Sequence, residues 1–170
     1  PARRGLTYYT AYRNEINARL FRSVEAALIY ERTTLHMGKI TFLGAGSTVF
    51  AKNIIGDCML TPSLCEFEIA LYDIDPQRLE DSYNMVCALN RNINENRSKI
   101  TKHLGVENRK DALRGATFAV NAIQVGGYEP CIVTDFETPK KYGLRQTIGD
   151  TNGIGGIFRA LRTIPVMQDF

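Results

Sequence analysis

The sequence contains no long apolar run, and most of it has no surplus of basic residues. No apolar stretch approaches the ~20 residues that a helix needs to cross a bilayer, and the amino terminus lacks the pattern of a secretion signal. Six of the 21 basic residues and three of the 18 acidic residues fall within residues 1–36, which leaves fifteen of each sign in residues 37–170. This balance does not favour nucleic-acid binding. We therefore expect a cytoplasmic protein without a membrane or nucleic-acid partner.

Cysteine and histidine are also scarce, with four cysteines and two histidines in the 170 residues. The cysteines show neither CxxC spacing nor the density of a small disulfide-rich domain, so we expect reduced thiols. Cys131 falls within a predicted helix, and His103 lies on a predicted strand without a second ligand at metal-binding spacing. We assign neither residue to a metal site.

One stretch organises the rest of the chain. Residues 39–43 predict a short buried strand, and Gly44-Ala-Gly46 leads from it into a helical segment with Val49, Phe50, Ile54 and Ile55 on one side. A strand, a glycine turn and a helix form the phosphate-binding start of a dinucleotide-binding fold. The third small residue of that fingerprint is replaced by Val49, so we expect less close packing there. An ordinary strand-to-helix turn is the alternative.

A second strand, predicted over residues 65–73, ends in Asp73. An acid in this position accepts hydrogen bonds from the adenosine ribose and repels a 2′-phosphate, which favours NAD over NADP. Asp75 and Pro76 predict the cap and first turn of a helix that runs to about Asn96.

The remaining segments predict a parallel sheet. Strands are expected over residues 99–104 and 117–123, with a turn of helix over 109–113 between them, which gives the strand order 3-2-1-4. Ligands of this fold lie beyond the carboxyl ends of the strands, so residues 121–127 should border the nicotinamide, although Gly126-Gly127 also fits a plain turn. A helix over residues 130–142, a glycine-rich loop over 149–156 and a final apolar-basic segment follow. Because only four strands are predicted, we expect an incomplete Rossmann-like α/β domain.

Residues 1–36 differ from the remainder and allow two interpretations. Ile16, Leu20, Val24 and Leu28 recur at helical spacing and favour an amphipathic helix that packs on the domain. Alternatively, these residues are an amino-terminal extension that is not part of the native protein. We favour the second interpretation because Met37 is a natural start for a fold that begins with a strand, and we take residues 37–170 as the nucleotide-binding domain.

Four separated motifs resemble glycoside hydrolase family 4, with the melibiase type of α-galactosidase as the nearest branch. They are residues 39–47, residues 72–76, residues 121–130 and residues 150–165. The resemblance covers residues 37–170, and it implies that the C-terminal α/β substrate domain is missing from the chain. It implies tightly bound NAD, a divalent metal (usually Mn²⁺) and an unusual route to glycoside hydrolysis. In that route the sugar is oxidised at C3, a base removes the C2 proton, the aglycone is eliminated, water adds at C1 and the hydride returns.

The resemblance also implies roles for particular residues. Cofactor contacts are expected from Gly44, Gly46, Ser47, Thr48, Asp73, Asn121 and Gln124, and substrate contacts from Gln124, Gly126, Gly127 and Asp150. In the phosphosugar branch an Arg occupies the position of Gln124, and a neutral amide cannot balance a phosphate dianion, so an unphosphorylated α-glycoside is expected. The metal ligands and the catalytic base are expected beyond residue 170, so the chain alone should be inactive. The full-length protein is expected to be a homo-oligomer.

Two alternatives remain at this point. A hydroxy-acid dehydrogenase of the lactate/malate type has a similar glycine turn and acidic segment, but the motifs at 124–130 and 150–156 argue against it. The chain could also be a non-catalytic nucleotide-binding module.

Overall fold

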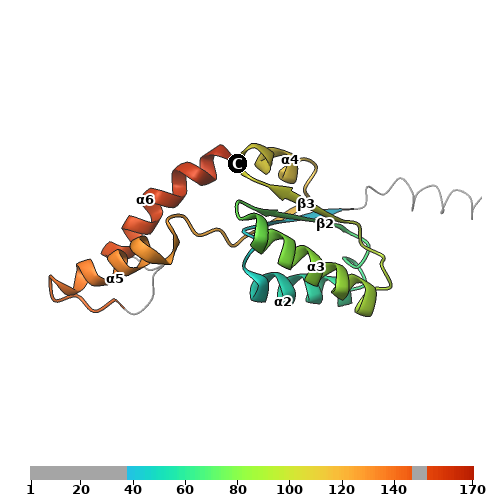
Figure 1. Cartoon of the computed structure of the whole chain (residues 1–170), viewed down its shortest axis with the longest axis horizontal. Helices are drawn as coiled ribbons and strands as arrows, with labels where there is room; N and C mark the ends of the chain where they lie inside the picture. The colour runs from blue at the N-terminus through green and yellow to red at the C-terminus, as the bar shows by residue number, and fades with distance from the viewer. Residues whose placement is uncertain (1–37, 147–152) are drawn as a thin grey trace, which may run out of the picture. The chain divides into compact units, whose positions relative to one another are not determined.

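The computed structural model describes residues 38–146 and 153–170, and a four-stranded parallel sheet lies at its centre (Figure 1). The strands are β1 (Lys39–Leu43), β2 (Glu68–Asp73), β3 (Ile100–Leu104) and β4 (Phe118–Asn121). Their order in the sheet, β3-β2-β1-β4, confirms the predicted order. The two interpretations of residues 1–36 and the predicted role of Asp150 lie outside the described residues.

The register brings the last residues of the strands to one edge of the sheet. Leu43 pairs with Tyr72 on one side and with Asn121 on the other, and Asp73 pairs with Leu104. Because all the strands are parallel, the segments that follow them emerge together. This edge positions the candidate site.

Helix α2 (Thr48–Leu60) follows the glycine turn and packs on one face of the sheet (Figure 1). Its buried face consists of Ala51, Ile55 and Met59. The predicted apolar side is therefore partly wrong, because Val49 and Phe50 are 69% and 61% exposed. The turn sets the helix so that the small Ala51 meets the sheet, and the expected crowding at Val49 does not arise.

Helix α3 (Pro76–Ile93) covers the same face beside α2. Asp75 caps it as predicted, because the Asp75 carboxylate accepts a hydrogen bond from the Arg78 N–H at 3.0 Å. The helix ends three residues before the predicted Asn96. Glu95 and Asn96 adopt φ angles of 53° and 58°, which a right-handed helix cannot contain. Its apolar stripe packs on the core as expected, with Leu79 and Val86 buried.

The opposite face of the sheet is covered by η1 (Val106–Asn108) and α4 (Arg109–Leu113). Leu43, Tyr72 and Ala112 form a second small core there. The Thr41 hydroxyl donates to the Ala112 carbonyl at 2.7 Å, so this polar core residue keeps a partner.

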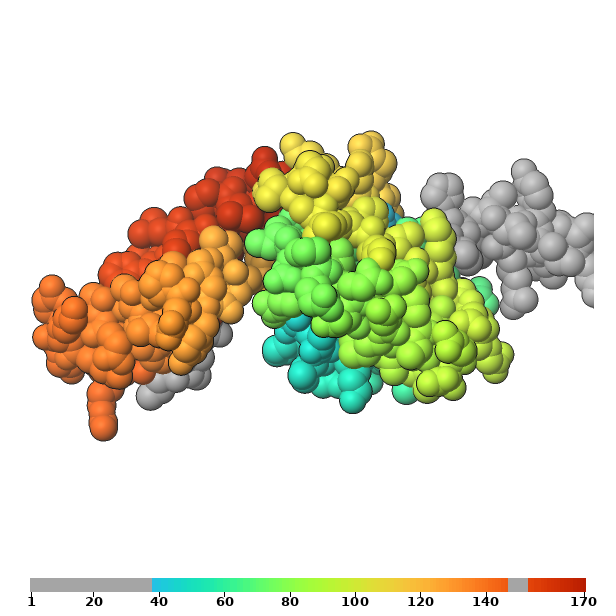
Figure 2. All heavy atoms as spheres, viewed as in Figure 1, coloured from blue at the N-terminus to red at the C-terminus, as the bar shows by residue number. Residues whose placement is uncertain are grey.

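The segment after β4 forms an irregular turn, η2 (Gly127–Ile132), and two helices, α5 (Val133–Lys140) and α6 (Ile154–Asp169). Figure 2 shows the orange atoms of α5 against the red atoms of α6. The helix predicted over residues 130–142 is thus divided into η2 and α5. The predicted loop over 149–156 is too long, because α6 already begins at Ile154. No helix in residues 38–146 or 153–170 is long and apolar enough to cross a membrane.

Candidate functional site

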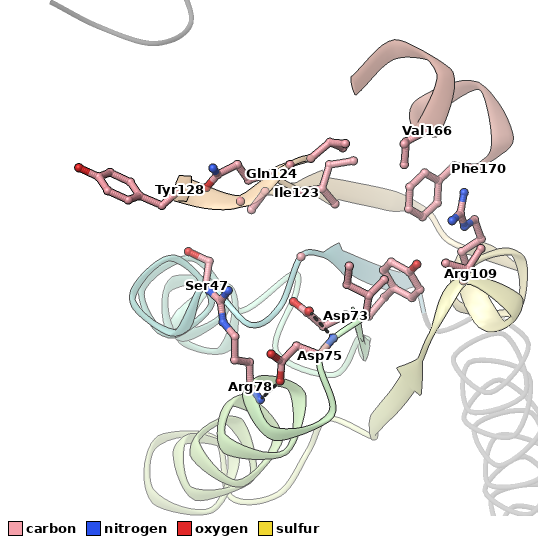
Figure 3. A pocket seen from close by; sticks show the side chains of 18 residues that line it. Ser47, Asp73, Asp75, Arg78, Arg109, Ile123, Gln124, Tyr128, Val166 and Phe170 are labelled. Atoms are coloured by element: carbon pink, nitrogen blue, oxygen red, sulfur yellow. Dashed lines mark hydrogen bonds between the residues drawn. The ribbon is translucent and has the colours of Figure 1, made fainter. Parts of the chain in front are cut away.

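A cavity of about 710 Å³ lies where the strands end, bounded by the glycine turn, the end of β2 and the segment after β4 (Figure 3). This volume is in the range of small-molecule and cofactor sites. Six of the residues predicted from the sequence line it, namely Gly44, Ser47, Asp73, Gln124, Gly126 and Gly127. The structure therefore brings together residues up to 83 positions apart along the chain.

Asp73 is bonded to the glycine turn and to the next loop. Its Oδ2 accepts from the Gly46 N–H at 2.6 Å, and its Oδ1 accepts from the Asp75 N–H at 3.0 Å. Each carboxylate oxygen has two lone pairs, so both keep one for a hydroxyl donor in the cavity. This geometry suits a ribose diol, while its negative charge opposes a phosphate at the same place.

The turn itself requires glycine at one position. Gly44 adopts a φ of +83°, and a Cβ there would lie 2.6 Å from the Ala122 carbonyl oxygen. The Gly44 and Ala45 N–H groups both donate to the Tyr72 carbonyl at 2.9 Å, which fixes the turn on β2.

The Gly46 N–H is bonded within the protein. It donates to Asp73 Oδ2, and Gly46 lines neither cavity, so its expected contact with the cofactor stays a prediction. Ser47 precedes α2 and makes no capping hydrogen bond with its side chain. The first N–H groups of α2, beginning with that of Thr48, have no intrahelical acceptor and create a positive end. The anion-binding capacity of the turn therefore comes from the start of α2.

Arg78 is a cavity residue that the sequence reasoning missed (Figure 3). Its Nε and Nη2 donate to the Gly46 carbonyl at 3.2 and 3.0 Å. The turn is consequently held from both sides, with Asp73 on the N–H and Arg78 on the carbonyl of one residue. No sequence signal marks this contact, because the two residues are 32 positions apart.

A second missed arginine, Arg109, lies at another end of the cavity (Figure 3). It is 8% exposed and its Nη1 bonds to Asp169 Oδ2 at 2.6 Å. The Phe170 ring stands 5.0 Å from the guanidinium and meets the Tyr72 ring edge-on at 5.5 Å. The end of α6 thus supplies an aromatic wall to the cavity. The sequence does not predict the ion pair between Arg109 and Asp169, because the two residues are 60 positions apart.

A second cavity of about 670 Å³ lies between α2, the end of β4 and α6. Ser47 and Gln124 line both cavities, whereas Asn121 lines only the second, together with Arg159. The Asn121 Oδ1 accepts from the Ile123 N–H at 3.2 Å. The structure therefore separates Asn121 from Asp73, and Thr48 lines neither cavity.

Arg162 of α6 links residues 124–127 to α5. Its Nε donates to the Val125 carbonyl at 3.4 Å, and its Nη1 and Nη2 form a bidentate ion pair with Asp135 of α5, with N–O distances of 2.9 and 2.6 Å. The hydrogen bonds that Arg162 donates to the Asp135 carboxylate raise the pKa of Arg162 above its already high ordinary value. Within the described residues, no group of three or more His, Cys, Asp or Glu side chains could hold a metal ion.

This sheet order, glycine turn and terminal acid define a Rossmann-like α/β domain. Comparison with known proteins then gives the family. Residues 39–170 match the model of the family 4 glycosyl hydrolases, and the chain belongs to that family.

Individual relatives agree with this assignment. The chain is 58% identical over 133 residues to an alpha-galactosidase of Bacillus subtilis, which covers 78% of this chain and 30% of the relative. It is 36% identical over 132 residues to an alpha-galacturonidase of Thermoanaerobacter italicus, which covers 78% of this chain and 27% of the relative. The structure of a Thermotoga maritima 6-phospho-beta glucosidase, solved with NAD and glucose-6-phosphate, superposes with a TM-score of 0.63 at 25% identity.

That superposition covers 77% of this chain and 30% of the other. The chain therefore spans about 30% of the length of these relatives. Membership of the family decides against a dehydrogenase of the lactate/malate type.

Proposed function

We propose that this chain is the NAD-binding part of an NAD-dependent glycosidase that cleaves an unphosphorylated α-glycoside, with an α-galactoside as the favoured substrate. The observation that carries the cofactor assignment is the position of Asp73, bonded to the glycine turn at the edge of a cavity large enough for a cofactor. The family relative solved with NAD supports the same cofactor.

The residues of the cavity fit a dinucleotide. Gly44 keeps the turn close to the sheet, the start of α2 attracts the pyrophosphate, and Asp73 accepts hydrogen bonds from the ribose. Arg78 adds positive charge beside the turn without occupying the acceptor atoms of Asp73. When bound, NAD⁺ supplies a reversible hydride acceptor for a sugar carbon. The described residues offer no group of three or more His, Cys, Asp or Glu side chains that could hold Mn²⁺. The metal ligands and the catalytic base stay predictions.

The preference for an unphosphorylated sugar rests on Gln124. Its amide lines both cavities and carries no charge, so it suits a sugar hydroxyl and does not stabilise a phosphate dianion. The 58% identity to an alpha-galactosidase supports this substrate class.

Arg159 favours a second candidate substrate. Arg159 lines the second cavity together with Gln124, and a guanidinium binds a carboxylate well. A uronic acid carries one carboxylate at C6, and one relative is an alpha-galacturonidase. An α-galacturonide is therefore the alternative to an α-galactoside.

The substrate proposal is tested in the protein at the length of its relatives, supplied with NAD⁺ and Mn²⁺. Nitrophenyl α-galactoside, its 6-phosphate and nitrophenyl α-galacturonide are compared by kcat/KM. We expect the α-galactoside to be cleaved fastest, and Gln124→Arg to shift the preference toward the 6-phosphate. Arg159→Gln should affect the galacturonide most. Faster cleavage of the 6-phosphate by the unmodified protein would contradict the role of Gln124.

A further inference from the structure

The turn after β4 is held in an unusual backbone shape. Gly126 and Gly127 have φ angles of +96° and +67°, a region that favours glycine. A Cβ on Gly126 would lie 2.5 Å from the Cys131 sulfur and 3.2 Å from Arg162 Nε. The turn therefore packs closely against Cys131 of η2 and against Arg162 of α6.

Arg162 joins this turn to the helical pair. Besides its two bonds to Asp135, its Nε donates to the Val125 carbonyl at 3.4 Å, which is long for a hydrogen bond but well aligned. Asp135 is only 1% exposed, so the two-fold ion pair fixes the plane of the guanidinium. Of the three N–H groups that are left in that plane, the Nε–H is directed at the turn.

We propose that Arg162 is a positioning residue, which uses Asp135 as its anchor to hold the Val125–Gly126 turn so that Gln124 and Gly127 face the first cavity. This inference rests on the proposed function, since it assigns the turn to the nicotinamide half of NAD. The adenosine half is instead assigned to Asp73 and the glycine turn, and neither of these bonds to Arg162.

Removal of one partner alone is a poor test, because it leaves an unpaired buried charge that can prevent the domain from folding. Two variants avoid this problem. Arg162→Lys keeps the charge but loses the planar fork. The double variant Asp135→Leu with Arg162→Met removes both charges and retains apolar volume, which is often neutral for stability. Arg114→Lys, in an exposed ion pair with Asp111, is the matched control.

The experiment has two measurements on the 170-residue chain. Hydrogen exchange compares the peptide over residues 122–128 with the β2 peptide over 68–73. Calorimetric titration compares NAD⁺ with ADP-ribose, which lacks the nicotinamide. We expect faster exchange in 122–128 alone, and NAD⁺ affinity about tenfold lower with ADP-ribose affinity unchanged, in both test variants and not in the control.

The other outcomes are distinct from one another. Unchanged exchange in 122–128 would overturn the positioning role even if NAD⁺ binds normally. Equal losses for NAD⁺ and ADP-ribose in a folded variant would show a general structural role and overturn it as well. If the unmodified chain binds neither ligand, the proposed cofactor site fails, and the exchange measurement still decides whether Arg162 holds the turn.

Discussion

Asp73 is the residue on which most of the site depends. It closes the glycine turn through Gly46, orders the start of the following loop through Asp75, and still presents free lone pairs to the cavity. Asn is the substitution of Asp73 that keeps most of this arrangement. It retains one acceptor oxygen for the Gly46 N–H and removes the charge, and its amide nitrogen gives up only the hydrogen bond from the Asp75 N–H.

We predict that Asp73→Asn weakens NAD⁺ binding by about 1–2 kcal/mol and narrows the preference for NAD⁺ over NADP⁺, because repulsion of the 2′-phosphate is lost. The measurement is titration of each cofactor. Asp75→Asn is the matched control, since Asp75 caps α3 and should leave the cofactor preference unchanged. Equal binding of both cofactors by the unmodified chain would refute the ribose assignment.

His103, on β3, is a residue of the sheet to which a pH dependence of stability can be assigned. Burial is the main reason that its pKa is lowered, and Lys39 acts in the same direction, against Asp111 and Glu68. The unfolded chain therefore takes up a proton more readily than the folded one as the pH falls below about 6.5. The stability associated with neutral His103 is present above that pH and is lost as the pH falls toward the lower folded value.

We predict that His103→Gln reduces the loss of Tm between about pH 7.5 and pH 5.5 relative to the unmodified chain. Gln keeps a hydrogen-bonding group near Thr101, which lies 3.3 Å from His103 Nε2. Thermal unfolding at several pH values is the measurement, and carboxylates contribute equally to both proteins. Identical pH profiles would show that His103 is not responsible.

At the scale of the elements, sequence periodicity located nearly all helices and strands. β1 and α4 have the predicted bounds, and β2, β3 and β4 are shorter than predicted by three residues or fewer at each end. Periodicity could not say which side of α2 is buried, because Val49, Phe50 and Ile54 are apolar as well and the turn decides the rotation. The contacts of Arg78, Arg109 and Arg162 were missed because each joins residues 27 or more positions apart.

The glycine-rich stretch before α6 shows the same limit. The sequence predicts a loop over residues 149–156, whereas Gly155 is buried inside α6 against α5. A Cβ there would lie 2.5 Å from the Asp135 carbonyl oxygen. The packing of α6 against α5 therefore requires glycine at position 155. The sequence does not reveal this requirement, because it does not show that α5 and α6 pack together.

We predict that Gly155→Ala destabilises the chain by about 1–3 kcal/mol, because backbone has to move to accept the methyl group. Gly56→Ala is the matched control. Gly56 lies inside α2, and a Cβ added there would have nothing within 4 Å, so alanine should be neutral or stabilising by up to about 1 kcal/mol. Urea unfolding of both variants measures the difference, and equal stabilities would contradict the close packing of α5 and α6.

At the scale of the whole molecule, the described fold begins at Gly38. The Gly38 carbonyl accepts from the Glu68 N–H at 2.9 Å, and a Cβ on Gly38 would collide with the Phe67 ring. Gly38 is therefore already packed on the sheet. The interpretation of residues 1–36 as an addition to the native domain stays a prediction.

We predict that deletion of residues 1–36 leaves the Tm of the chain nearly unchanged. An apolar stripe that packs on the domain would instead contribute buried area, and its removal would lower the Tm by several degrees, roughly 2–4 °C for each kcal/mol lost in a chain of this length. Differential scanning calorimetry of the two chains distinguishes these interpretations.

The outer edge of β4 has a consequence for handling the protein. Among the described strands β4 pairs only with β1, and its Phe118 is 54% exposed. The opposite edge, β3, carries Lys102 in an ion pair with Glu80. Charged residues of this kind discourage pairing with another chain, whereas an apolar edge invites it. Aggregation of concentrated preparations of this chain should therefore start at β4, and a lysine introduced on that strand is the first substitution to try when yields are poor.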